Sequence, residues 1–502
     1  MDITNIIQGL TILPSANMPL YLQLANALQA KIISMEIPRG TRLPPERELA
    51  RLLEVSRTTT LHAYRHLEQQ GLIISRRGSG TYVNGLPENL PAENRMHWQQ
   101  IFAPPYKSPF SSLLRTLISP PLAEDTISLG AGMPDPSFYP LEELRQAAET
   151  AQPEIAPQQY GYLATEGYFP LRQALATWQK QFGHTGTPDQ YLIVSGSQQG
   201  LYLIVKTLIE PQDYVILEAP AYMGAIQSME AAGARLLTLP TGKPLDFSLL
   251  EDYLIRYRPK LFYTVPTFHN PTGWVLSLEE RKKLLALASR YRLVIIEDDP
   301  YSLLYYDQLP PPSLKSLDTY GGVIRLGTFS KILLPGLRLG WVEADQAVID
   351  RLAEEKQHVD LHCNNLSQLL LAPCLTSGLI DRHLQQIRRE YKIRRDAIVQ
   401  ALRQYCSPYM DFTVPQGGFY IWCRLNSNIS TTELMQRAAV HGVSFVPGIA
   451  FYSSGAASQE IRLCFSAHPP EVLREGIRRI GRLLAQIEEK PAQQQRPAYP
   501  LI

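Results

Sequence analysis

The chain has 502 residues, 45% hydrophobic and 19% charged, with a formal net charge of +1. This composition excludes a disordered or collagen-like protein, and the length suggests roughly three units at about 100–200 residues per domain. There is no run of about 20 apolar residues, no signal-peptide start and no metal-ligand spacing among the five cysteines, so we expect a cytoplasmic, disulfide-free protein without a membrane span or a bound metal.

Residues 1–85 are predicted to form three helices followed by a β-hairpin. The expected elements are helices over residues 19–35, 44–53 and 57–70 and strands over residues 72–75 and 81–83. Ser56 is a candidate N-cap for the third helix, and Gly71 is a signal for its end. The segment carries nine Lys and Arg against six acidic residues, which is only a modest positive excess. This order of elements indicates a winged helix-turn-helix.

The third helix and the hairpin carry the residues that we expect to contact DNA. A recognition helix needs polar donors at its start, where side chains meet base edges and free N–H groups meet phosphate. The expected DNA-binding residues are Arg47, Ser56, Arg57, Thr58, Thr59, Arg76, Arg77 and Gly78. The alternative is a winged helix that binds protein, in which these arginines form only a solvated face.

The composition changes after residue 85. Residues 86–125 hold seven prolines and show no sustained periodicity, which predicts a semi-extended linker. From residue 126 to residue 489, short apolar strands alternate with helices, which favours a mostly parallel α/β sheet. The expected strands are residues 191–195, 214–218, 261–265, 293–297 and 323–326, and the expected helices include 198–209 and 277–290. Residues 490–502 are predicted to be a flexible tail.

Several separated segments of the α/β region suit one cofactor. Pyridoxal phosphate needs an amine for a Schiff base, an acid for its pyridinium nitrogen, donors for its phenolic oxygen and a phosphate cradle. Lys331 follows a predicted strand and is the candidate amine. Asp298 would pair with the ring nitrogen, and Tyr301 and Asn270 would reach the phenolic oxygen.

The remaining candidates would hold the phosphate, the ring and a substrate. In the turn 196–200, which joins a predicted strand to a helix, backbone N–H groups and Ser197 would bind phosphate. Tyr222 is a candidate to stack on the ring, and Arg462 is a candidate fork for a substrate carboxylate, beside Asn270. The cofactor-binding set is completed by Gln198, Thr328 and Arg338. Each of these residues, taken alone, also has an ordinary structural explanation.

Two family resemblances bring these patterns together. LPPERELARLLEVSRTTTLHAYRHLEQQGLIISRRGSGTYV resembles the DNA-binding domain of the GntR regulators over residues 15–85, with Pro45 where the family often has serine and Leu61 where some members have arginine. SGSQQG, EAPAY, NPTG, EDDPY, TFSK, GLRLGW and IRLCFS occur in the order and spacing of fold-type I aminotransferases over about residues 126–490. The second resemblance looks closest to the branch that handles 2-aminoadipate and kynurenine.

The aminotransferase resemblance implies a large domain with a central seven-stranded sheet, a smaller C-terminal subdomain, and a homodimer that shares its active sites. Tyr160 matches the family tyrosine that reaches the partner subunit's phosphate. A GntR-type winged helix fused to such a domain resembles the MocR-type regulators. The resemblance therefore implies a regulator that binds double-stranded DNA and pyridoxal phosphate and responds to the cofactor or to an amino acid.

Two alternatives stay open. The first is an active aminotransferase that carries a DNA-binding module, with Lys331, Asp298 and Tyr301 as catalytic residues. It stays open because the chain keeps Asn270 and the enzyme-like segment EDDPY, which many MocR-type regulators replace. The second is a DNA-binding protein whose large domain serves only as a dimerisation scaffold.

Overall fold

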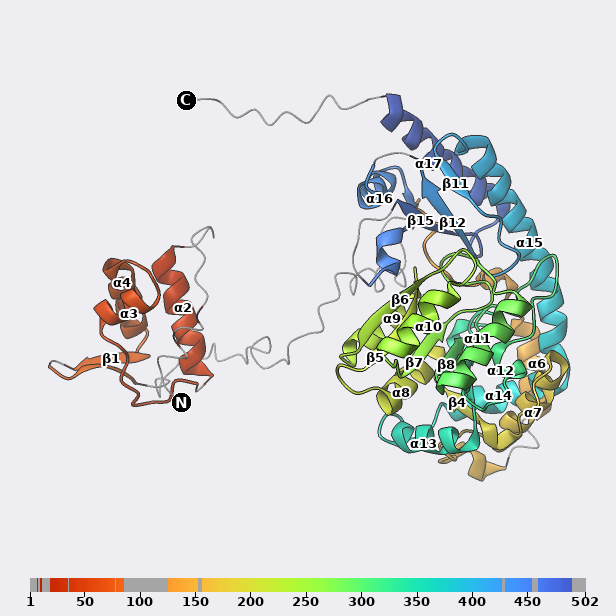
Figure 1. Cartoon of the computed structure of the whole chain (residues 1–502), viewed down its shortest axis with the longest axis horizontal. Coiled ribbons are helices and arrows are strands. Elements are labelled where there is room, and N and C mark those ends of the chain that lie inside the picture. The colour runs from red at the N-terminus through yellow and green to blue at the C-terminus, as the bar shows by residue number, and fades with distance from the viewer. Residues whose placement is uncertain are drawn as a thin grey trace. The chain divides into compact units, whose positions relative to one another are not determined.

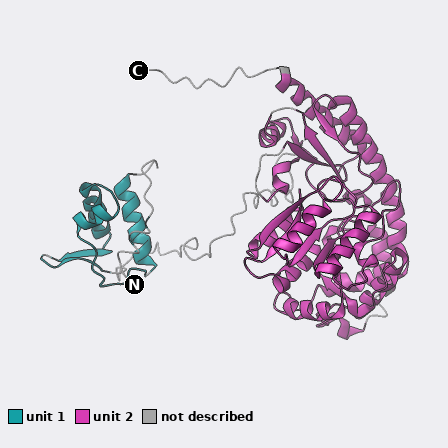
Figure 2. Ribbon diagram, in the orientation of Figure 1, with its two compact units in different colours: residues 1–106 teal, residues 107–502 magenta. Residues whose placement is uncertain are grey.

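The chain divides into two units, residues 1–106 and residues 107–502, in the computed structural model (Figure 2). The structure describes residues 7, 10, 19–34, 36–76, 78–84, 125–151, 156–426, 429–453 and 459–489. Arg77, residues 86–124 of the expected linker and the expected tail 490–502 lie outside the described residues.

The first unit contains the expected three helices and hairpin. Its elements are α2 (Leu20–Ile33), α3 (Glu46–Leu52), α4 (Arg57–Gln69), β1 (Ile73–Arg76) and β2 (Gly80–Val83). The two strands pair antiparallel, with Ile73 opposite Val83. Ser56 caps α4 as its sequence position predicts, because its side chain accepts a hydrogen bond of 3.0 Å from the backbone N–H of Thr59. Leu28 and Leu67 are fully buried in the small core between these elements.

A seven-stranded sheet forms the centre of the second unit (Figure 1). Its strands in spatial order are β4 (Tyr191–Val194), β10 (Gly340–Glu343), β9 (Val323–Thr328), β8 (Val294–Asp298), β7 (Leu261–Thr264), β5 (Tyr214–Ala219) and β6 (Arg235–Pro240). Only β10 runs antiparallel to its neighbours in this sheet. The mostly parallel α/β sheet that the sequence predicts is therefore confirmed, with β10 and β6 as strands that the prediction lacked.

Helices cover both faces of this sheet, and successive strand residues alternate between two cores. Ile296 of β8 packs with α8 (Ser197–Leu208), α9 (Met223–Ala231) and α13 (Gln346–Gln357). Its neighbour Ile295 faces the other way, toward α10 (Phe247–Arg256), α11 (Leu278–Tyr291) and the short α12 (Leu314–Leu317). Apart from β6, which is mostly half-buried, the strands are buried on both faces, which explains why these segments read as continuous apolar runs.

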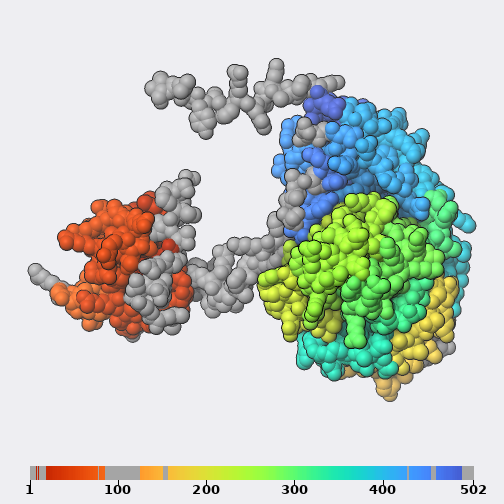
Figure 3. Space-filling view, in the orientation of Figure 1, coloured from red at the N-terminus to blue at the C-terminus, as the bar shows by residue number. Residues whose placement is uncertain are grey.

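A second, smaller sheet belongs to the C-terminal subdomain, residues 410–489, which is drawn in blue in Figure 3. Its strands in spatial order are β11 (Met410–Phe412), β12 (Tyr420–Leu425), β15 (Glu460–Cys464) and β14 (Val446–Pro447). Strand β3 (Ile127–Ser128) pairs in parallel with β13 (Val443–Ser444) beside this sheet. The remaining α-helices are α6 (Leu141–Ala151), α7 (Phe169–Gln179), α14 (Asn365–Thr376), α15 (Leu379–Tyr405), α16 (Thr431–Val440) and α17 (Pro470–Glu489).

Within the described ranges, no helix is both long and apolar enough to cross a membrane. The same part of the chain holds no cluster of three His, Cys, Asp or Glu that could bind a metal ion.

Candidate functional site

A cavity of about 480 Å³ opens where the parallel strands of the large sheet end. Ten of the residues predicted from the sequence line it. Nine of them lie at or beyond strand ends or at the start of a helix, and Arg462 lies in the middle of β15. The ten are Ser197, Gln198, Tyr222, Asn270, Asp298, Tyr301, Thr328, Lys331, Arg338 and Arg462. The topology thus brings together residues that lie up to 265 positions apart, the separation of Ser197 and Arg462.

Lys331 follows β9 and is the amine of the cavity. Its Nζ donates a hydrogen bond of 2.6 Å to the backbone carbonyl of Gly132. Burial, together with the positive charges of Arg462 and Arg338, lowers the pKa of Lys331 to about 8. A larger fraction of this amine is therefore neutral, and so nucleophilic, near neutral pH than for an exposed lysine.

Asp298 ends strand β8 and is buried. Burial raises the pKa of Asp298 to about 6, against the effect of a hydrogen bond of 2.6 Å that Tyr263 donates to its Oδ2 atom. The other carboxylate oxygen, Oδ1, is buried and lacks a protein hydrogen-bond partner. A buried acceptor in that state is suited to a donor supplied by a ligand.

Arg462 crosses from the C-terminal subdomain to the cavity. Its two Nη atoms donate to Asn270 Oδ1 at 2.8 Å and to the carbonyl of Gly130 at 2.7 Å. Its Nε atom is buried without a hydrogen-bond partner, and its guanidinium lies 4.2 Å from the ring centroid of Tyr420. The side chain is held rigidly and keeps a free donor, which is the arrangement that favours carboxylate binding.

Tyr301 and the start of α8 occupy two other walls of the cavity. The hydroxyl groups of Tyr301 and Tyr420 lie 3.0 Å apart. Helix α8 begins after Gly196 without a side-chain cap, so its first backbone N–H groups are available to a ligand. Gly196 has a φ of +92°, and a Cβ there would lie 3.0 Å from Nη2 of Arg338. Glycine thus lets the Arg338 guanidinium approach the start of α8. An anion bound there would contact both the guanidinium and the free N–H groups of the helix.

Gln198 and Tyr222 contact each other at the cavity edge. The Tyr222 hydroxyl donates to Gln198 Oε1 at 3.2 Å, and Gln198 donates onward to Ser228 at 3.1 Å. Thr328 is used differently, because its hydroxyl accepts a hydrogen bond of 3.1 Å from the backbone N–H of Ser330. It thereby shapes the turn that carries Lys331.

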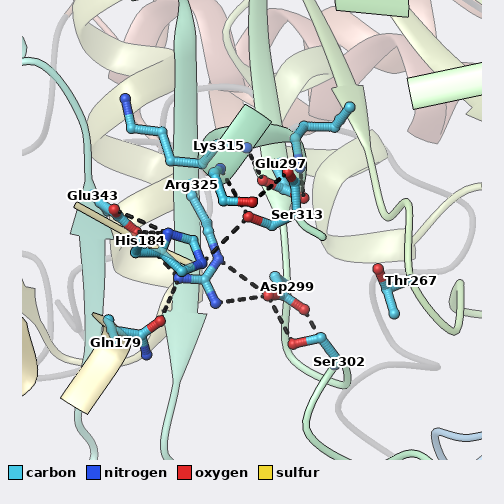
Figure 4. A network of polar contacts seen from close by, with 12 residues as sticks. Gln179, His184, Thr267, Glu297, Asp299, Ser302, Ser313, Lys315, Arg325 and Glu343 are labelled. Atoms are coloured by element: carbon cyan, nitrogen blue, oxygen red, sulfur yellow. Dashed lines mark hydrogen bonds and ion pairs between the residues drawn. The ribbon is translucent and has the colours of Figure 1, made fainter. Parts of the chain in front are cut away.

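A buried charge network lies behind the cavity, next to Asp298 in the chain (Figure 4). Arg325 is its centre, and it donates to Asp299 at 2.8 Å and to Glu343 at 3.1 Å. Glu343 also contacts His184 at 3.0 Å. Burial alone would raise the pKa of Glu343, but His184 and Arg325 outweigh it and lower that pKa to about 2. These fixed charges hold the loop that follows β8.

The remaining predicted residues lie away from this cavity. Tyr160 ends a short 3-10 helix, Pro157–Tyr160, and its side chain is 49% exposed. In the first unit, Arg47, Ser56, Arg57, Thr58, Arg76 and Gly78 are exposed, while Thr59 is half-buried and bonded to Ser56. Arg76 also packs over the ring of Tyr82, with 5.3 Å from guanidinium carbon to ring centroid.

Sequence reasoning missed two parts of the cavity wall, Tyr420 and residues 130–133, and one residue behind it, Tyr263, which bonds to Asp298. Tyr263 sits inside a buried strand, where nothing distinguishes it from core packing. Tyr420 comes two residues after the pair Gly417 and Gly418, and residues 130–133 include Gly130 and Gly132. Paired glycines indicate a close approach of the backbone, so a sequence signal was available in both places. A Cβ on Gly132 would lie 1.8 Å from the Tyr420 hydroxyl, so this contact requires glycine.

Comparisons with known proteins agree with this architecture. Residues 124–480 match the family of class I and II aminotransferases, and residues 20–83 match the bacterial regulatory proteins of the gntR family. The chain is 35% identical to aromatic-amino-acid aminotransferase 1 of Thermococcus litoralis over 81% of its own length and 99% of the relative's. It is 33% identical to the HTH-type transcriptional regulator YisV of Bacillus subtilis over 92% of its own length and 95% of the relative's.

A solved structure is similar over the second unit. The α-aminoadipate aminotransferase of Thermus thermophilus, complexed with N-(5'-phosphopyridoxyl)-L-leucine, is 35% identical, with a TM-score of 0.70 over 78% of this chain and all of that one. The match to a regulator extends across both units, whereas the matches to enzymes cover the second. The chain therefore belongs to the class I and II aminotransferase family and has the MocR-type architecture, in which a gntR-family winged helix precedes the aminotransferase domain.

Proposed function

We propose that this chain is a transcriptional regulator that binds double-stranded DNA through its winged helix and binds pyridoxal phosphate, and an amino-acid effector, through its aminotransferase-like domain. The observation that carries the proposal is the convergence of ten predicted residues on one cavity in a chain that also carries a gntR-family domain. The proposed domain boundaries are residues 85, 125 and 489.

The donor and acceptor set of the cavity fits pyridoxal phosphate. Asp298 offers a buried, unpartnered Oδ1 to the pyridinium N–H, and Tyr301, which lines the cavity, would donate to the phenolic oxygen. The uncapped start of α8 and Arg338 suit the phosphate. When bound, the cofactor supplies an aldehyde that reacts with amines and a ring that withdraws electrons. Lys331, with its lowered pKa, supplies the amine.

The effector class follows from Arg462. Its buried Nε atom lacks a protein partner, so a carboxylate bound there satisfies the donor and gains a charge-assisted hydrogen bond. Asn270 is bonded to the same guanidinium and orients it from the far side. An α-amino acid would therefore bind with its carboxylate at Arg462, in the cavity that Lys331 also lines.

The DNA interface consists of the exposed start of α4 and the hairpin tip. Ser56 caps α4, and Arg57 and Thr58 occupy its first turn, where recognition helices contact base edges. Arg47 on α3, and Arg76 and Gly78 on the hairpin, supply contacts to the phosphate backbone, and Arg77, which lies between them in the sequence, belongs to the same proposed set. A homodimer would present two such units, with Tyr160 of each subunit at the phosphate site of the other.

A second candidate function, an active aminotransferase, is favoured by one specific observation. Lys331, Asp298, Asn270 and Arg462 all line the same cavity, so the groups needed to bind an amino acid and to move a proton near it are present. The two functions are compatible in one chain.

One experiment separates these functions. The visible absorbance of the full chain is recorded with pyridoxal phosphate, for the wild type and for Lys331→Ala, and a panel of amino acids is then titrated. A Lys331-dependent band that an amino acid shifts without keto-acid release supports the regulator. Release of a keto acid supports the enzyme, and the absence of any Lys331-dependent band contradicts both cofactor-dependent functions.

A further inference from the structure

One segment of the second unit runs from the small subdomain into the cavity. This segment consists of strand β3 and the residues that follow it up to Met133, and its first part is tied to residues 442–444 by backbone hydrogen bonds. Ile127 N–H donates to Gly442 at 2.9 Å, and Leu129 N–H donates to Ser444 at 2.7 Å. Beyond them, the Ser466 hydroxyl donates to the carbonyl of Met133 at 2.6 Å.

Between these anchors, two of the cationic side chains that line the cavity, Arg462 and Lys331, hold the same backbone. The carbonyl of Gly130 accepts from Arg462 at 2.7 Å, and the carbonyl of Gly132 accepts from Lys331 at 2.6 Å. The Tyr420 hydroxyl presses against Gly132, which leaves no room for a side chain there. The segment is thus held by the two groups that a cofactor and an amino acid would also engage.

We propose that Gly130 and Gly132 are positioning residues for Arg462 and Lys331, and that their carbonyls lose these donors when ligands bind, so that residues 127–133 respond to occupancy of the cavity. The proposal rests on the function proposed above. Lys331 would leave the Gly132 carbonyl when its Nζ bonds to the aldehyde carbon of a bound cofactor and the aldehyde oxygen is released as water. A carboxylate that accepts from the free Nε and from Nη2 of Arg462 together would displace the Gly130 carbonyl from Nη2, because a carboxylate is a stronger acceptor than an amide carbonyl.

The position of this segment in the chain links its response to the DNA-binding unit. Residues 127–133 come early in the second unit, and residues 85–124 connect them covalently to the winged helix. A ligand can bias a conformational equilibrium only through contacts that differ between the states. The two exchanged hydrogen bonds are such contacts, and they act on the segment that leads to the DNA-binding unit.

Hydrogen–deuterium exchange of the full chain tests the proposal. Pyridoxal phosphate is expected to accelerate exchange of the Ile127 and Leu129 amides about tenfold, because loss of a buried charge-assisted hydrogen bond shifts local opening by this order. Strand β5, residues 214–219, is the internal control and should not change. Lys331→Ala should exchange as fast without the cofactor as the loaded wild type does, and the cofactor should not alter it further.

Ser466→Ala is the matched control, because it removes an anchor of the same segment without touching a ligand. It should raise the basal exchange while keeping the response to pyridoxal phosphate. Lys331→Met, which fills the lysine's volume, replaces Lys331→Ala if that variant fails to fold.

The outcomes separate this inference from the proposed function. Equal exchange at Ile127 and Leu129 in the empty wild type and the empty Lys331 variant overturns the inference, whether or not the cofactor binds. Absorbance that shows bound cofactor together with unchanged exchange overturns the inference and leaves the proposed function standing. Absorbance that shows no bound cofactor contradicts the proposed function, and the comparison of empty proteins still decides the inference.

Discussion

The Tyr263 hydroxyl donates a hydrogen bond of 2.6 Å to Oδ2 of Asp298, while Oδ1 of the same carboxylate is buried without a protein partner. One oxygen is therefore fixed by the fold, and the other is left for a ligand. Because the bond is donated to the charged form, it lowers the pKa of Asp298 against the opposing effect of burial.

Tyr263→Phe is expected to weaken pyridoxal phosphate binding about tenfold or more, since a hydrogen bond to a charged group contributes about 1.5–3 kcal/mol. The variant leaves Oδ2 unpaired, and the pKa of Asp298 rises further. The Kd from an absorbance titration measures the effect. Tyr320→Phe, which loses a hydrogen bond of 3.0 Å to the Leu293 carbonyl far from the cavity, is the control. Equal affinities of the wild type and Tyr263→Phe would contradict the role given to Tyr263.

Arg57→Ala is expected to reduce discrimination between DNA sequences. The Arg57 side chain is 60% exposed at the first position of α4, and its contact with Glu46, at 3.8 Å, is too long to hold it. Loss of a base-edge contact costs about 1–3 kcal/mol of discrimination. Binding is measured on a duplex that the wild-type chain selects from a random pool, and on scrambled DNA.

Arg47→Ala, on the preceding helix α3, tests a contact to the DNA backbone rather than to a base. As a phosphate contact, it should weaken binding to both duplexes and reduce the salt-dependence slope by about one. Lys31→Ala is the control, because Lys31 lies on α2 and pairs with Glu36 at 2.6 Å. If Arg57→Ala lowered affinity for both duplexes equally, Arg57 would be a phosphate contact.

Sequence reasoning identified residues that the structure brings to one cavity where a local motif marks them. Ser56 was recognisable because an N-cap needs a short polar side chain one residue before the helix. Asp298 and Lys331 were recognisable because polar residues at the ends of buried strands stand out from the apolar runs that precede them. The parallel sheet followed from the same alternation of strands and helices.

The missed residues depend on contacts between distant segments. Tyr263 is a buried strand tyrosine like any other until Asp298 is placed on the neighbouring strand. The Gly130 and Gly132 carbonyls belong to the backbone, so no pattern of side chains predicts their hydrogen bonds. Strand β10 was not predicted because it runs antiparallel within a mostly parallel sheet and no α-helix separates it from β9.

Attachment of pyridoxal phosphate to Lys331 is expected to depend on pH with a midpoint of about 8. The neutral amine reacts, and it forms as the pH rises through the lowered pKa of Lys331. The initial rate of the absorbance change, recorded between about pH 6 and pH 10, should therefore level off above the midpoint. A free lysine derivative, with an ordinary pKa of about 10.4, is the comparison and should keep accelerating. The same continued acceleration in the protein would contradict the lowered pKa.

Arg325→Leu is expected to destabilise the second unit by about 3–5 kcal/mol, because it leaves Asp299 and Glu343 buried without their counter-charge. Urea unfolding followed by tryptophan fluorescence measures this, since the described tryptophans, at positions 178, 274, 341 and 422, all lie in that unit. Arg351→Ala is the control. Arg351 makes comparable ion pairs with Glu354 and Glu355 on the surface, where such pairs contribute about 0–1 kcal/mol.

Arg325→Leu should also change how the free energy of unfolding depends on pH in the acid range. The pKa of Glu343 lies at about 2 in the folded chain, below its ordinary value of 4.5, so its stabilisation is present above pH 4.5 and is lost as the pH falls toward 2. Without Arg325 the folded pKa moves back toward the ordinary value, so Arg325→Leu should lose less stability over that range than the wild type does. If both proteins lost stability in parallel between pH 4.5 and pH 2, Arg325 would not be what holds the Glu343 carboxylate ionised.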